Sequence, residues 1–152
     1  MKISFIDVDS HNYPNLALMK LSAWHKKQGD NVEWYDFTRH YNIVYMSKVF
    51  SFTPDYGYVV NADHVIRGGT GYAIHGAGGE HYISENDRPL PYEVEHMMPD
   101  YGLYNIKDTA YGFLTRGCPR GCSFCIVGKK EGVCSRKVAD LEEFWGGKKQ
   151  SF

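Results

Sequence analysis

Three cysteines in one short stretch are the residues of this sequence best suited to chemistry. Cys118, Cys122 and Cys125 are spaced C-x3-C-x2-C within residues 112–125, which read GFLTRGCPRGCSFC. Three thiolates on one tight loop can hold three corners of a cuboidal iron–sulfur cluster. A [4Fe–4S] cluster normally takes four cysteines, so three leave one iron open, as in catalytic metal sites. The spacing therefore predicts a cluster with one iron accessible to a substrate.

The residues between the cysteines favour a tight loop with positive charge around it. Gly117 and Gly121 permit turns with positive φ, and Pro119 fixes the backbone between the first two ligands. Arg116 and Arg120 add positive charge, which lowers the pKa of nearby thiols and offsets a negatively charged cluster. We expect both arginines to act on the cysteines.

An apolar run before the loop predicts a strand over residues 110–115, and Phe124 directly precedes the last cysteine. This combination resembles the signature loop of the radical S-adenosylmethionine (radical SAM) superfamily, over residues 110–127. The resemblance implies that the open iron of a [4Fe–4S] cluster chelates the methionyl part of SAM, which is reductively cleaved to a deoxyadenosyl radical. It also implies that Phe124 lies on the adenine side of SAM, and that a reductant protein such as flavodoxin or ferredoxin is a partner.

Two other interpretations of the cysteines stay open. Cys134 completes a C-x3-C-x2-C-x8-C arrangement, which a zinc-stabilised, non-enzymatic binding module would use. Zinc knuckles more often use two C-x2-C pairs, and only one such pair is present. The other reading is electron transfer through a cluster that never meets SAM.

Composition sets the class of protein. The 152 residues are 43% hydrophobic and 23% charged, which is typical of a globular domain with a core of its own. The formal net charge of −1 gives no overall field that would attract nucleic acid or an anionic membrane. Between residues 113 and 137, however, six basic residues face a single acid, Glu131; they are Arg116, Arg120, Lys129, Lys130, Arg136 and Lys137. We expect this stretch to balance the cluster on a solvated surface, and nucleic-acid binding is not indicated.

The cysteine pattern and the hydropathy also point to a compartment. The chain opens with a strand-like run, so we expect no secretory signal, and no apolar stretch approaches the length of a membrane span. Four cysteines, three of them on one loop, do not resemble a disulfide framework. Because an iron–sulfur cluster suits a reducing compartment, we expect a cytoplasmic protein without membrane contact.

The first 75 residues have the pattern of a small Rossmann-like domain. A buried strand is predicted over residues 2–8, then a helix over 14–28 with Pro14 in its first position and Asp9 or Asn12 as its cap. Further strands are predicted over 32–35, 42–49 and 65–67, with a helical turn over 54–61. Strand, helix and strand in this order predict a parallel sheet with residues 2–8 in its centre. Ligands of such sheets bind beyond the carboxyl ends of the strands.

The order of a Rossmann-like half and a cysteine loop resembles radical SAM proteins with an N-terminal cobalamin-binding-type domain. Cobalamin binders of that kind carry D-x-H-x-x-G, then S-x-L, then G-G. This sequence has Asp9 and His11 but Pro14 in place of the glycine, then 47–49 (Ser-Lys-Val) and 68–69 (Gly-Gly). Because a bulky cofactor needs close backbone approach, we expect no tight cobalamin binding and a turn or capping role for His11.

Two glycine-rich segments resemble motifs that we do not assign. Residues 78–80 (Gly-Gly-Glu) resemble the radical SAM segment that contacts the SAM amino group, but they precede the cysteine loop instead of following it. Residues 68–71 lack the G-x-G-x-x-G pattern and a P-loop lysine. We expect a backbone turn there.

The predicted organisation is α/β in three parts. Residues 1–75 form the Rossmann-like domain, 76–109 an irregular linker or covering segment with a short helix near 92–97, and 110–152 the first βα unit of an incomplete radical SAM partial barrel. Asp140 and Glu143 form a capping box that opens a helix. Only 27 residues follow Cys125, whereas a complete eight-unit barrel takes about 250 residues. We therefore expect a fragment, or part of a split gene whose second chain supplies the rest of the barrel.

Overall fold

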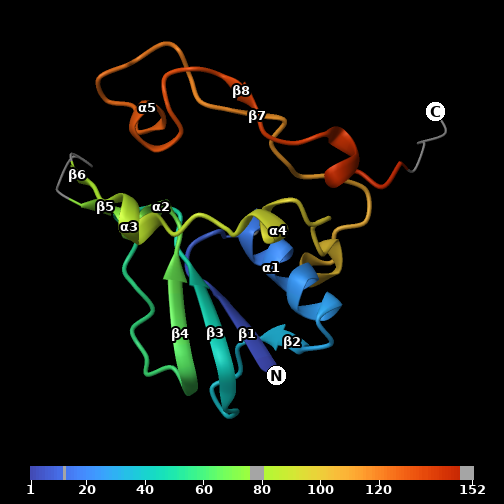
Figure 1. Ribbon diagram of the computed structural model, residues 1–152. Helices are drawn as coiled ribbons and strands as arrows, with labels where there is room; N and C mark the ends of the chain where they lie inside the picture. Colours follow the sequence, from blue (N-terminus) through green and yellow to red (C-terminus); the bar gives the residue numbers. More distant parts are fainter. Residues whose placement is uncertain (12, 76–80, 148–152) are drawn as a thin grey trace.

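A four-stranded parallel sheet forms the centre of the molecule (Figure 1). The computed structural model describes residues 1–11, 13–75 and 81–147. The sheet consists of β1 (Lys2–Asp7), β2 (Asn31–Trp34), β3 (Tyr41–Ser47) and β4 (Ala62–Gly68), in the order β2-β1-β3-β4. Every neighbouring pair is parallel. The predicted α/β fold with a small Rossmann-like sheet and a central first strand is confirmed.

Helix α1 (Leu16–Lys27) connects β1 to β2 and begins later than predicted. Asn15 is its N-cap, and the Asn15 Oδ1 atom accepts a hydrogen bond from the Leu18 N–H at 3.2 Å. The predictions of Asp9 as the cap and of Pro14 as the first helical residue are wrong; Asn12, the other predicted cap, lies outside the described residues. Asn15, and not an earlier residue, caps the helix because its side-chain nitrogen also donates to the Ser47 Oγ atom of β3 at 2.8 Å. This bond fixes the helix start to the sheet.

The two faces of the sheet are covered by different kinds of structure. On one face, α1 packs against β1 through a core that contains Ile3, Phe5, Leu18 and Leu21. On the other face, a second core of Ile6, Tyr41, Val44 and Met46 is covered by Tyr35, Tyr56, Val60 and their neighbours. The helical turn predicted over 54–61 is therefore wrong, since this segment runs without helix and its apolar side chains cover the sheet.

Short helices and strands occur between residues 70 and 107, including in the part of 76–109 that the structure describes and that was predicted to be irregular. They are α2 (Thr70–Ala73), β5 (Ile74–His75), β6 (His81–Tyr82), α3 (Ser84–Asp87), α4 (Tyr92–Glu95) and a 3₁₀ turn η1 (Tyr101–Tyr104). Helix α4 confirms the short helix expected near 92–97. Its Val94 is 3% exposed and joins the core between α1 and the sheet, so this segment covers α1.

The C-terminal segment crosses beyond the carboxyl ends of the sheet strands (Figure 1). It consists of β7 (Thr115–Arg116), α5 (Val127–Lys130), β8 (Arg136–Lys137) and a 3₁₀ turn η2 (Leu141–Glu143). The strand predicted over 110–115 is wrong except at Thr115, since β7 begins there and pairs antiparallel with β8. At Gly112 the chain instead packs against the Phe144 ring, which lies 2.3 Å from where a Cβ would be. The capping box of Asp140 and Glu143 is confirmed, but it opens a 3₁₀ turn instead of an α-helix.

Candidate metal centre

The cysteine loop is held at its base by the β7–β8 pair. Thr115 pairs with Lys137 and Arg116 with Arg136, so the loop leaves and returns to the same short ribbon. The Cys118 N–H donates to the Gly132 carbonyl at 3.2 Å, directly above this ribbon. These backbone contacts hold the two ends of the loop base together.

Positive φ angles occur at the two glycines that the sequence singled out. Gly117 has φ +89° and Gly121 has φ +61°, which L-residues with side chains rarely adopt. At Gly117 a Cβ would also lie 2.2 Å from the Cys134 carbonyl oxygen. Between the second and third cysteines, the Cys125 N–H donates to the Cys122 carbonyl at 3.0 Å and closes a turn. The positive φ predicted at both glycines is confirmed.

The four thiols are free and differ in exposure. Cys118 and Cys125 are half-buried, whereas Cys122 and Cys134 are exposed. Among the described residues, no three Cys, His, Asp or Glu side chains are grouped as metal ligands would be. The donor set nevertheless fits a cluster chemically, because three uncommitted thiols lie on one loop whose glycines allow it to turn.

Phe124 lies at the surface of this loop and is 92% exposed. An aromatic ring with so little protein contact leaves its face open for stacking on another flat group. The predicted role beside the adenine of SAM stays a prediction.

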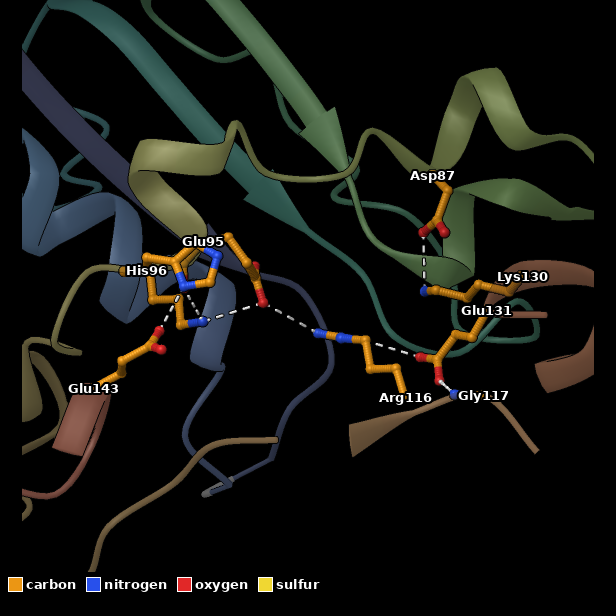
Figure 2. Close-up of polar contacts among 9 residues, drawn as sticks. Asp87, Glu95, His96, Arg116, Gly117, Lys130, Glu131 and Glu143 are labelled. Carbon is orange, nitrogen blue, oxygen red and sulfur yellow. Dashed lines mark hydrogen bonds and ion pairs between the residues drawn. The ribbon is translucent and has the colours of Figure 1, made fainter. Parts of the chain in front are cut away.

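Arg116 does not act on the cysteines as predicted. Its guanidinium lies 2.9 Å from Glu131 Oε1 and 3.5 Å from Glu95 Oε1 (Figure 2). It also covers the Phe113 ring, 4.6 Å from the ring centre. Two carboxylates therefore compensate its charge. Arg120 makes no ion pair with any described residue, so it is the arginine that adds net charge to the loop.

Ion pairs link the loop base to helix α1 in a continuous chain. Lys20 of α1 is 6% exposed and lies 3.2 Å from Glu95 Oε1. Glu95 in turn contacts Arg116, and Arg116 contacts Glu131 (Figure 2). The sequence did not reveal this chain, because its partners come from three separate segments.

A second set of contacts docks α5 onto the N-terminal half. The Lys130 ammonium donates to Asp87 Oδ1 at 3.1 Å and to the Thr70 hydroxyl. The other carboxylate oxygen of Asp87 accepts the Tyr82 hydroxyl at 2.8 Å. Burial, and then this hydrogen bond, raise the pKa of Tyr82 to about 12. The cysteine loop is thereby attached beside the end of β4.

The chain after the loop is fixed by η2. His96 Nδ1 lies 2.6 Å from Glu143 Oε2, and the Tyr101 hydroxyl donates to the Phe144 carbonyl at 2.5 Å. The Asp140 N–H, and then His96, hold the pKa of Glu143 below its usual range. Glu143 therefore serves both the capping box and the contact with α4.

Charges in the basic stretch are mostly matched by the protein's own acceptors. Arg116 and Lys130 pair with the acids described above, Lys137 pairs with Asp140, and Arg136 donates to the Glu131 carbonyl at 2.9 Å. A paired cation has little left to offer a phosphate backbone. Four of the six basic side chains of this stretch are therefore engaged within the protein, and the absence of nucleic-acid binding stays a prediction.

Asp9, the first residue of the cobalamin-like pattern, supports the sheet. Its carboxylate is 1% exposed and accepts the Val49 and Phe50 N–H groups, each at 2.8 Å. Ser47 is committed to the Asn15 side chain. His11 is exposed and has φ +40°, which fits a turn residue. The lack of tight cobalamin binding stays a prediction.

The glycines after β4 are explained by Lys48. A Cβ at Gly69, which has φ +100°, would lie 2.4 Å from the Lys48 carbonyl oxygen. A Cβ at Gly71 would lie 2.6 Å from Lys48 Cγ. The predicted backbone turn over 68–71 is confirmed, since these glycines admit a neighbouring strand end. Residues 78–80 lie outside the described residues.

A surface hollow of about 460 Å³ lies at the opposite, amino-terminal edge of the sheet. It is lined by Met1, Lys2, Arg39, His40 and Asn42. Most of its cationic groups are committed: the terminal ammonium to Asp30, Arg39 to Glu33 and Asp36, and His40 to Asp63. This hollow is therefore a weaker candidate for function than the cysteine loop.

Comparisons with protein-family models, curated proteins and solved structures gave no match to this chain. Within the described part of the chain, no helix combines the length and the apolar character needed to cross a bilayer.

Proposed function

We propose that Cys118, Cys122 and Cys125 hold a [4Fe–4S] cluster of the radical SAM type, with SAM as the ligand of the open iron. The observation that carries this proposal is the C-x3-C-x2-C spacing of three free thiols on one glycine-containing loop. When bound, a reduced cluster of this type supplies one electron to SAM, whose C–S bond breaks to give methionine and a deoxyadenosyl radical.

The chain's own residues contribute binding and position. The three thiols, deprotonated, are the ligands, and the ribbon of β7 and β8 holds the loop base that carries the first of them. Phe124, on the exposed side of the loop, is available to stack on the adenine of SAM. Arg120 offsets the negative charge that three thiolates bring. A reductant protein such as flavodoxin or ferredoxin would deliver the electron.

Metal content in single cysteine variants tests the proposal. After anaerobic reconstitution with iron and sulfide, the unchanged chain should bind about four irons per molecule. Alanine at any of the three loop cysteines should abolish this, whereas Cys134→Ala should retain it. The proposal is refuted if Cys134→Ala alone loses the metal, or if the unchanged chain binds no iron.

SAM binding is tested on the reconstituted protein. Addition of SAM should change the electron paramagnetic resonance spectrum of the reduced cluster, because the open iron gains ligands. Phe124→Ala should weaken SAM binding with no change in iron content. A spectrum that SAM leaves unchanged would favour electron transfer through a cluster that does not bind SAM.

One observation favours the alternative, a zinc-stabilised binding module using all four cysteines. The Cys134 carbonyl packs against Gly117, the residue before Cys118, so Cys134 lies next to the loop base. Protein purified without added metal separates the two proposals. A colourless protein that contains about one zinc per chain, and loses it in Cys134→Ala, would establish the zinc module.

A further inference from the structure

Glu131 joins the two ends of the cysteine loop. Its Oε1 atom accepts the Arg116 guanidinium at 2.9 Å, and its Oε2 atom accepts the Gly117 N–H at 3.1 Å (Figure 2). The next residue along, Gly132, accepts the Cys118 N–H at 3.2 Å. Three successive residues at the start of the loop are therefore bound to two successive residues at its end.

Glu131 is itself held by contacts on both sides. Its N–H donates to the Val127 carbonyl at 2.8 Å and so ends α5, and its carbonyl accepts the Arg136 guanidinium of β8. The Glu131 side chain is 21% exposed. A carboxylate that is fixed at its backbone and partly shielded from water can hold a facing N–H in one place.

We infer that Glu131 is the positioning residue for Cys118, the first metal ligand; this rests on the proposed function. Gly117 has φ +89° and faces the Cys134 carbonyl, so its conformation is unusual and needs a partner. The Glu131 carboxylate supplies that partner by binding the Gly117 N–H. The Cys118 thiol leaves the backbone one residue later, and its direction follows from that conformation.

The chain of ion pairs extends this effect into the N-terminal half. Arg116 binds Glu131 on one side and Glu95 on the other, and Glu95 binds the buried Lys20 of α1. The loop base that carries Cys118 is thus connected to helix α1 through this chain of ion pairs. Groups that orient a metal ligand in this way commonly change metal affinity when they are removed.

The first test needs no metal. In the metal-free, reduced protein, the alkylation rates of Cys118 and Cys125, both half-buried, are measured by peptide mass mapping. Glu131→Ala should raise the rate at Cys118 by about tenfold, because two charge-assisted hydrogen bonds, from Arg116 and from the Gly117 N–H, are lost. Glu131→Gln keeps an acceptor for the Gly117 N–H and should give a smaller increase.

Cys125 and Glu142 provide the controls. Glu142 is an exposed acid on η2, and Glu142→Ala should leave both rates unchanged. An equal increase at Cys118 and Cys125 in Glu131→Ala would mean general loosening of the structure and would overturn the inference. An unchanged Cys118 rate would overturn it as well.

The second test uses the reconstituted protein. Glu131→Ala should lose iron to a chelator about tenfold faster than the unchanged chain, with Glu131→Gln in between and Glu142→Ala unchanged. Equal rates in all four proteins would overturn the inference. If the unchanged chain takes up no iron, the proposed function fails, and the alkylation rates alone decide whether Glu131 positions Cys118.

Discussion

Asp9, which follows β1, is expected to contribute strongly to the stability of the protein. Its carboxylate is buried and accepts two backbone N–H groups, from Val49 and Phe50. Asp9→Ala leaves both N–H groups without an acceptor, and each such group costs about 1–3 kcal/mol. Relief from burying a charge offsets part of this cost. We expect a loss of about 3 kcal/mol in the free energy of unfolding, against a total of about 5–15 kcal/mol for a domain of this kind.

Urea unfolding followed by tryptophan fluorescence measures this loss, since Trp24 packs against the core of α1 and β1. Asp9→Asn keeps one acceptor oxygen and should cost about half as much as Asp9→Ala. Asp108→Ala serves as the control, because Asp108 is exposed and, among the described residues, its side chain bonds the neighbouring Thr109 hydroxyl and no other group. A loss below about 1 kcal/mol in Asp9→Ala, or one equal to the control, would refute the reasoning.

Three further predictions concern a buried glycine, an acid that contacts α1 and the lysine that attaches α5. Gly71→Ala should destabilise the protein by about 1–3 kcal/mol through overpacking, whereas Gly57→Ala, with no atom within 4 Å of the added Cβ, should be nearly neutral in the same urea assay. Burial would raise the pKa of Asp100, but hydrogen bonds from a lysine and a serine of α1 hold it below its usual range. Its contribution is therefore present above its unfolded pKa of about 3.9 and is lost as pH falls through the lower folded value, so Asp100→Asn should flatten the acid limb of a stability–pH curve. Lys130→Ala should speed hydrogen exchange in residues 115–137 by releasing α5, and Lys129→Ala should not.

The sheet was predictable from the sequence because its signals are local. The run over 2–8 shows little alternation of polar and apolar residues, as expected for a strand buried on both faces. Strand–helix–strand order then predicts a parallel pair. The start of α1 was not predictable in the same way. Asn15 is chosen as the cap by Ser47, a residue 32 positions away in the sequence, and no local pattern contains that contact.

The remaining differences arise where tertiary packing overrides local preference. Residues 54–61 carry turn-forming residues, yet Tyr56 and Val60 are drawn onto the open face of the sheet. Strand β4 extends over Ala62–Gly68, more than twice the predicted length, because pairing with β3 supports polar residues at an edge. The strand expected over 110–115 forms only at Thr115, and in the part that forms no strand Gly112 packs against Phe144.

The candidate site divides in the same way. The cysteines and the two glycines with positive φ could be identified from spacing and residue type alone. The role of Arg116 could not, since its partners Glu95 and Glu131 lie 21 and 15 positions away. A single acid among six bases was the available signal, and it marked Glu131 without indicating what that residue binds.

The loop has a base held by contacts within the protein and an outer part that carries two of the three proposed ligands, Cys122 and Cys125. The contacts of Glu131 and Gly132 with residues 116–118 close a loop of 15 residues, 117–131, in the protein alone. Closing a flexible chain of that length costs about 2 kcal/mol in entropy. Hydrogen bonds and the β7–β8 ribbon already offset this entropy loss. The proposed metal would therefore have to order only residues 119–125. Pro119 restricts that segment and Gly121 turns it, so fewer backbone conformations are open to the residues between the proposed ligands.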